Sequence, residues 1–245
     1  MDPLTITAAS GMRSRLESLD MLANNIANAE TSGYKVDREF YGLYTSQEAE
    51  TADGADPATL PVIEKNYTDF SQGLTRVTSN PLDFAIQGEG FFSLDTPSGV
   101  AYTRNGSFQL SSTGAVVSSE GYTVRSAAGQ PLKLNPALPI EVSAEGTISQ
   151  SGQNVGRFAV LNFDNPGDLV KQGNTMFRTA DPKLAPKPST AAVQQGRLEN
   201  ANVSTSESAV RLVSVLRQFE MLQKAANIGA EMNKQAIQDV ARVGS

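Results

Sequence analysis

Residues 204–243 have the sequence STSESAVRLVSVLRQFEMLQKAANIGAEMNKQAIQDVARV, which contains no proline and one glycine, Gly229. Apolar side chains recur in this stretch at steps of three and four residues, which is the period of an amphipathic α-helix. Ser204 followed three residues later by Glu207 matches a capping box, so the helix is expected to begin near residue 205. At about 1.5 Å per residue such a helix is roughly 55 Å long, more than a domain of this size needs to cross its own core.

Two apolar rows follow this predicted helix. Their combined stripe is broader than the seam of a two-stranded coiled coil. From this stretch alone, packing on a core of the same chain and packing on other helices both remain open. The first row, in heptad register with a break at Asn233, is Leu212, Val215, Phe219, Leu222, Ala226, Gly229, Ala236, Val240 and Val243; the second row is Val213, Leu216, Met221, Ala225, Ile228 and Met232.

A second helix is predicted at the other end of the chain, over residues 3–27. Asp2 is a suitable N-cap, and Pro3 occupies the first helical position, where its missing N–H is tolerated. The sequence therefore predicts an α+β fold in which long N- and C-terminal helices form a coiled-coil-like helical domain beside a central, mainly β domain. The strict a/d row of the N-terminal helix is Ala9, Met12, Leu16, Leu19, Ala23 and Ile26.

Three asparagines, Asn24, Asn25 and Asn28, stand where the apolar pattern of the first helix ends. Asparagine suits helix ends and turns because its amide bonds to nearby backbone, and Gly33 offers a left-handed stop. One interpretation is a capped helix terminus. The other is a belt of amide hydrogen bonds between packed helices.

Composition excludes several classes of function. The 245 residues include no cysteine and no histidine, so disulfides, thiolate or imidazole metal sites and histidine-based catalysis are excluded. The net charge of -6 disfavours nucleic acid, and no apolar run is long enough for a membrane span. The first residues lack the basic and apolar regions of a cleavable signal peptide. We therefore expect no cofactor, no metal and no enzymatic activity.

Between the two predicted helices the helical periodicity gives way to short apolar runs separated by turn residues. The expected organisation is an N-terminal helix region at 1–33, an extended linker region at 34–60 with an acidic stretch at 45–58, a central β domain at 61–203 and a C-terminal helix at 204–245. Asn105-Gly106 predicts a tight turn with positive φ at both residues, and 88–90 (GEG) predicts a tight turn rather than a phosphate-binding loop. Expected strands are 83–86, 91–95, 101–104, 107–110, 115–118, 122–125, 132–134, 139–142 and 157–163.

Four motifs, in order along the chain, resemble signatures of the bacterial flagellar rod and hook protein family. They are similar to the family patterns NNxAN…TxGYK, LDxAIxGxGFF, YTRxGxF and GxLExSNV, with Ala201 where the family usually has serine. In this chain they are ANNIAN at 23–28 with TSGYK at 31–35, LDFAIQGEGFF at 82–92, YTRNGSF at 102–108 and GRLENANV at 196–203.

Within that family, the chain length and single β domain are similar to the FlgF- and FlgG-type rod proteins, and RQFEMLQK at 217–224 resembles the FlgF (proximal-rod) type. The resemblance implies a structural subunit of the basal-body rod, the helical tube that transmits torque from motor to hook. It also implies assembly with copies of itself and other rod proteins, export through the flagellar type III apparatus without a cleaved signal, and a periplasmic location in the flagellar basal body. A distal-rod (FlgG-type) or hook-like subunit is the alternative.

The predicted functional residues are those of a subunit interface. Two other classes remain open: a periplasmic carboxylate-dependent hydrolase using Glu89 and Asp95, and a β-sandwich binding module with helical ends. Terminal helices with such wide stripes are expected to finish folding against neighbouring subunits. The interface residues are Met12, Leu16, Leu19, Asn24, Asn25, Ile26, Asn28, Leu212, Leu216, Phe219, Met221, Leu222, Ile228 and Met232.

Overall fold

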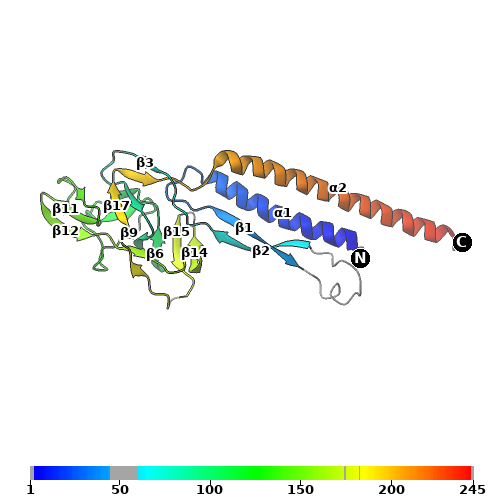
Figure 1. Ribbon diagram of the computed structural model, residues 1–245, viewed down its shortest axis with the longest axis horizontal. Helices are drawn as coiled ribbons and strands as arrows, with labels where there is room; N and C mark the ends of the chain where they lie inside the picture. The colour runs from blue at the N-terminus through cyan, green and yellow to red at the C-terminus, as the bar shows by residue number, and fades with distance from the viewer. Residues whose placement is uncertain (1–2, 45–59, 174, 182, 244–245) are drawn as a thin grey trace. The chain divides into compact units, whose positions relative to one another are not determined.

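The computed structural model describes residues 3–44, 60–173, 175–181 and 183–243 (Figure 1). The chain divides into two compact units. The helix-bearing unit comprises Met1–Ala27, Asp37–Tyr67 and Ser204–Ser245, and the β-rich unit comprises Asn28–Val36 and Thr68–Val203. The chain therefore crosses between the units four times. The acidic stretch predicted at 45–58 lies outside the described residues.

Two helices, α1 (Pro3–Ala27) and α2 (Thr205–Val243), occupy the ranges that the apolar periodicity predicts. The Ser204 hydroxyl accepts a hydrogen bond from the Glu207 amide at 3.3 Å, as an N-cap should. In Figure 1 the helices run in opposite directions, and α2 continues past the beginning of α1. The helix-bearing unit also contains a two-stranded sheet of β1 (Asp37–Tyr44) and β2 (Leu60–Thr68).

The predicted fold class is wrong in its helical part. The terminal helices are not a matched long pair, because α1 has 25 residues and α2 has 39, and strands share their unit. The reason lies in the phase of α1: Leu16 of its predicted seam is 49% exposed, whereas Ser18 and Leu22 are buried. A seam that includes serine is not the apolar a/d seam of a coiled coil. The α+β class with a mainly β centre fits in part.

The β-rich unit is built on a nine-stranded sheet. Seven of its strands follow the order β14-β15-β6-β5-β9-β8-β7, while β13 pairs with β5 and with β16. The pairings are antiparallel, as short strands joined by tight turns require. These strands are β5 (Phe91–Thr96), β6 (Gly99–Thr103), β7 (Phe108–Leu110), β8 (Val116–Ser118), β9 (Thr123–Val124), β13 (Val160–Asn162), β14 (Leu169–Gln172), β15 (Met176–Thr179) and β16 (Lys187–Pro188).

Three smaller sheets and one 3-10 helix complete this unit. Strands pair in the order β10-β11-β12, and two separate pairs are β17-β4 and β18-β3. The predicted strand at 132–134 is an isolated bridge between Lys133 and Ala115. The additional elements are β3 (Thr75–Val77), β4 (Phe84–Gln87), β10 (Glu141–Val142), β11 (Thr147–Gln150), β12 (Gln153–Arg157), η1 (Pro166–Asp168), β17 (Ala192–Gln195) and β18 (Arg197–Glu199).

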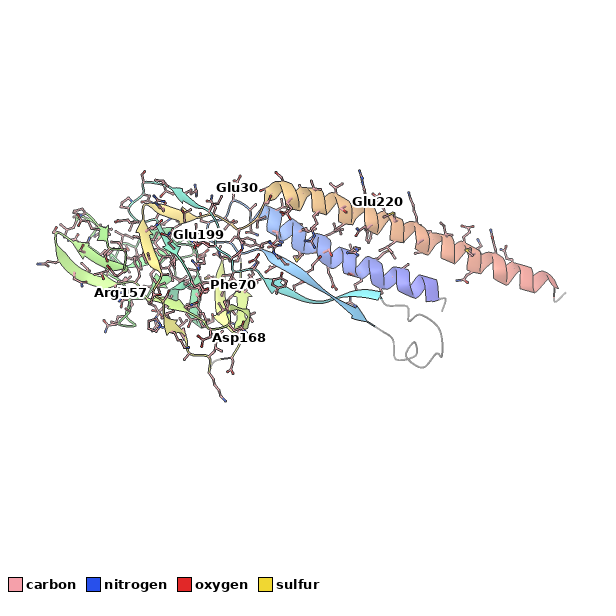
Figure 2. All side chains as sticks on the ribbon, in the orientation of Figure 1. Glu30, Phe70, Arg157, Asp168, Glu199 and Glu220 are labelled. Carbon is pink, nitrogen blue, oxygen red and sulfur yellow. The ribbon has the colours of Figure 1, made fainter. Side chains whose placement is uncertain are left out.

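Aromatic rings fill the interior of the β-rich unit. In the main cluster the Phe92 ring packs edge-on against Phe108 at 5.2 Å and Phe158 at 5.5 Å between ring centres. A second cluster surrounds Phe91 and Phe177, with Phe70 packed against both (Figure 2). Edge-to-face packing of this kind adds to the free energy gained from burying the rings.

The two predicted glycine turns have different outcomes. Gly88 and Gly90 have φ of 109° and 149° between β4 and β5, so the tight-turn interpretation of 88–90 is confirmed. The prediction for Asn105-Gly106 is wrong, because neither residue is among those with positive φ in the described chain. Gly106 is required for a different reason: a Cβ there would lie 1.8 Å from the Phe84 carbonyl oxygen.

Candidate assembly surface

One row of α2 packs against α1. Val215 is buried, while Leu212, Phe219 and Leu222 are partly buried. A Cβ on Gly11 of α1 would lie 3.2 Å from Leu222 Cδ1, so the two helices approach closely at this glycine. We call Leu212, Val215, Phe219, Leu222, Ala226 and Gly229 the inner row of α2.

The second apolar row of α2 faces away from its own chain. We call Val213, Leu216, Met221, Ile228 and Met232 the outer row; their exposed fractions lie between 42% and 63%. Five large apolar side chains on one exposed helix face exceed the scattered single residues that a soluble surface normally carries. The outer row is therefore an exposed apolar surface, interspersed with charged side chains such as Arg217, Glu220 and Lys224, that the described chain does not cover.

The buried face of α1 is one residue out of phase with its apolar row. Ala8, Ser18, Leu22 and Asn25 are buried, and the Ser18 hydroxyl donates to the Ser14 carbonyl at 3.1 Å. Small side chains on this face leave room for α2. The apolar row predicted to be the seam is consequently turned partly outward: Leu16 is exposed, and Met12, Leu19 and Ile26 are partly buried.

Two of the three asparagines at the end of α1 and in the turn after it, Asn25 and Asn28, bond to nearby backbone. The buried Asn25 amide donates to the Asp37 carbonyl at 2.9 Å and accepts from the Asp37 amide at 3.1 Å, so it pairs with the first residue of β1 as a neighbouring strand would. Asn28 is buried in the turn that follows, where its carbonyl accepts from the Thr31 amide at 3.0 Å. Asn24 is exposed. Because Asn25 and Asn28 are covered by their own chain, we leave both out of the surface proposed below.

Sequence reasoning missed a buried cluster of charges in the β-rich unit. Lys35 Nζ lies 2.6 Å from Glu199 Oε1, and Arg104 Nη1 lies 3.3 Å from Glu199 Oε2. The Lys35 and Glu199 side chains are both 0% exposed. Burial lowers the pKa of Lys35, and the Glu199 carboxylate opposes this shift. Each residue belongs to a different motif quoted above, which is the signal that could have connected them.

The carboxylates of the hydrolase hypothesis lie in different surroundings. Asp95 Oδ1 is 3.2 Å from Arg125 Nε, and the Glu89 carboxylate accepts a hydrogen bond from the Asn162 side-chain nitrogen at 3.1 Å. Glu89 lines an open cavity with Asp164 and Lys187, and Asp95 is not among the residues lining it. Within the described residues, no group of three or more acidic side chains is placed to hold a metal ion. Neither helix is long and apolar enough in its described part to cross a membrane.

An exposed apolar helix face is typical of structural subunits that assemble. Comparisons with known families agree with this class. Residues 7–35 match the family described as flagella basal body rod protein, residues 85–152 the flagellar hook protein FlgE/F/G D1 domain, and residues 194–239 the C-terminal region of flagellar basal body rod FlgEFG proteins.

Relatives cover nearly the whole chain. The chain is 31% identical to the flagellar basal-body rod protein FlgF of Caulobacter vibrioides, over 99% of this chain and 100% of that protein. It is 33% identical to FlgF of Mesorhizobium japonicum over 82% of this chain and 83% of that protein. The FlgG rod protein of Bacillus subtilis is 29% identical over 93% of this chain and 95% of that protein.

The chain belongs to the flagellar basal-body rod protein family and is of the FlgF type. It is a structural subunit of the rod in the flagellar basal body, where it assembles with other rod components. The prediction that it is not an enzyme is confirmed by the family, whose members are structural rod proteins. The distal-rod alternative is not better supported than the FlgF type, although FlgG proteins are also among the relatives.

Proposed function

We propose that the outer row of α2, together with Leu16 and the partly exposed Met12, Leu19 and Ile26 of α1, is the surface through which this subunit contacts copies of itself and other proteins of the proximal rod. The observation that carries the proposal is the 42–63% exposure of the five outer-row side chains on a subunit whose family builds a rod. A surface of this composition loses its contact with water once a neighbouring helix packs on it.

Hydrophobic burial is large enough to drive this contact. Full burial of a Leu, Ile, Val or Met side chain stabilises by about 1.5–3 kcal/mol, so covering an approximately half-exposed one contributes about 1 kcal/mol. Five outer-row residues then contribute about 5 kcal/mol at each interface, before the entropy of association is subtracted. A rod repeats such contacts along its length, so modest contributions per subunit suffice.

Two ion pairs beside the proposed surface are made within the helix-bearing unit. Arg211 Nη2 lies 3.0 Å from Glu39 Oε2 of β1, and Arg13 pairs with Glu17 on α1 at 3.3 Å. Within each of these pairs the two opposite charges offset each other. Arrival of the subunit through the flagellar type III export apparatus, in the periplasm, is part of the same proposal, since an exposed apolar row is suited to completing its burial only at the site of assembly.

Two charge-introducing substitutions test the proposed surface. Leu216→Glu and Ile228→Glu should abolish or strongly reduce recovery of the subunit in purified basal bodies, because each places a carboxylate in the contact. Both side chains are exposed, so the thermal unfolding of the isolated protein should change little. Phe219→Asp is less discriminating because Phe219 belongs to the inner row and its loss also weakens the contact with α1.

The matched control is Gln223→Glu, which adds the same charge at an exposed polar position of α2. It should leave recovery in basal bodies unchanged. Normal recovery of both Leu216→Glu and Ile228→Glu would contradict the assignment of the outer row as the contact surface.

A further inference from the structure

The segment Gly33–Val36 is buried although it belongs to no helix or strand. Tyr34, Lys35 and Val36 all lie in the interior of the β-rich unit. Lys171 covers the segment from one side: its ammonium group lies 4.3 Å from the centre of the Tyr34 ring and donates to the Lys35 carbonyl at 2.7 Å. A buried irregular segment must find hydrogen-bond acceptors and donors outside itself. The Tyr34 amide donates locally, to the Thr31 carbonyl at 3.2 Å, but the other partners described below come from distant parts of the chain.

Glu199 supplies the first connection. Its carboxylate accepts from Lys35 Nζ at 2.6 Å and from the Gly73 amide at 2.9 Å, and its main-chain carbonyl accepts from the Gly33 amide at 2.8 Å. Lys35 Nζ also donates to the Ser71 carbonyl at 2.6 Å. A lysine in the interior is tolerated only with such a countercharge and such acceptors. The partner that Lys35 needs lies 164 residues further along the chain.

Asn202 supplies the second connection. Its side-chain oxygen accepts from the Val36 amide at 2.8 Å, and its amide nitrogen donates to the Asp69 carbonyl at 2.8 Å. The Asp69 amide in turn donates to the Val36 carbonyl at 2.8 Å. One asparagine thus joins three segments that adjoin three of the four crossings between the units.

We propose that Gly33–Val36 and Glu199–Asn202 form a clasp, a conformational device that opens and closes as one cooperative unit and closes only when the segment after α1 and the segment before α2 meet on the β-rich unit. This inference is independent of the rod contact proposed above. A chain that does not yet extend to residue 199 leaves Lys35 without its countercharge, and one that ends before residue 202 lacks the Asn202 bonds, so closure requires nearly the whole chain.

Arg104, the third residue of the charge cluster, also bonds to backbone outside the clasp, so the clasp is expected to open without the sheet. Arg104 Nη2 donates to the Gly88 carbonyl at 2.7 Å and Nη1 to the Ile86 carbonyl at 3.4 Å. When the clasp opens, Arg104 loses its pair with Glu199, 3.3 Å away, but keeps these two carbonyl acceptors, which lie outside the clasp. Opening therefore exposes Lys35 and Glu199 to water while the phenylalanine core stays closed.

Amide hydrogen exchange of the full-length chain tests the clasp. Under native conditions with low denaturant, the amides of Gly33, Val36 and Asp69 should share one opening free energy and one denaturant dependence. Core amides such as those of Val116 and Leu132, which donate to Leu132 and Val124, should require a larger opening. Different opening behaviour of the three clasp amides in the wild-type chain would overturn the proposal, as would exchange together with the core.

Two variants sharpen the test. Asn202→Ala should accelerate exchange at the Gly33 amide, which Asn202 does not contact, at least about tenfold, and Lys35→Met should likewise accelerate exchange at Asp69. Lys187→Met is the matched control, because it removes the exposed ion pair with Asp164 at 2.7 Å and should leave the clasp amides unchanged. Acceleration confined to the Val36 amide in Asn202→Ala, or no acceleration at Asp69 in Lys35→Met, would refute cooperative opening.

Discussion

Gly106 offers the sharpest test of the reasoning about packing. An alanine Cβ at this position would lie 1.8 Å from the Phe84 carbonyl oxygen and 3.2 Å from Phe92 Cε2. Because an ordinary contact of this kind is about 3.4 Å, the backbone of β4 has to move by more than 1 Å. The movement breaks the hydrogen bond from the Phe84 amide to the Gly106 carbonyl, which is 3.0 Å long.

The expected cost can be assembled from these parts. Loss of one or two hydrogen bonds costs about 1–2 kcal/mol, and forced overpacking of a closed core costs about 1–3 kcal/mol. Gly106→Ala should therefore destabilise the protein by about 2–5 kcal/mol, which corresponds to a fall in Tm of about 10 °C for a chain of this size. Thermal unfolding followed by circular dichroism or calorimetry measures the shift.

Gly121→Ala separates this steric effect from the conformational effect of glycine. Gly121 has φ of 86° with nothing near a built Cβ, so its replacement should cost only about 1–2 kcal/mol of backbone strain. If Gly106→Ala lowered the Tm no more than Gly121→Ala, the close approach to Phe84 would not be the reason for glycine at 106.

Three further outcomes are expected. Ser204→Ala should lower the free energy of unfolding by about 1 kcal/mol in urea titrations, because the Glu207 amide loses its cap, whereas Ser204→Asp should retain the stability. Asn25→Leu fills the same space without the paired bonds to Asp37, and proteolysis should then reach residues 28–36 faster than in the wild-type chain. Burial raises the pKa of Tyr102 above 10.0, so the folded state holds the phenolic proton more tightly; stability from this group is complete below pH 10.0 and falls as the pH rises through the folded-state pKa. Tyr102→Phe should remove that alkaline loss, and equal pH dependence of unfolding in both proteins would contradict it.

Periodicity located both helices because a 3.6-residue pattern extends over many turns. The apolar pattern predicted the wrong buried face of α1. The face that is buried includes small side chains such as Ala8 and Ser18, because α2 approaches closely there. The phase was thus decided by side-chain size and by hydrogen bonds of Ser18 and Asn25. Hydrophobicity alone does not contain that information.

The strands show a similar division. Apolar runs such as Phe91–Thr96 were recognisable, whereas β17 and β18 are short and rich in polar residues, and their pairing with β4 and β3 joins segments over a hundred residues apart. The contact of Lys35 with Glu199 was not predicted for the same reason, since the two residues are 164 positions apart in the sequence. Pairing across a chain follows from the tertiary fold, and short polar strands carry little local signal of it.

The buried residues of α1 precede its apolar row by one position, so the buried face and the apolar row are about 100° apart around the helix axis. Ser18 and Leu22 belong to the face that packs within the chain, and Leu16 belongs to the face that stays open. A substitution on one face therefore has little effect on the other. Such a subunit can acquire new neighbours by mutation, or adapt to rods of different composition, without first risking the stability of its own fold.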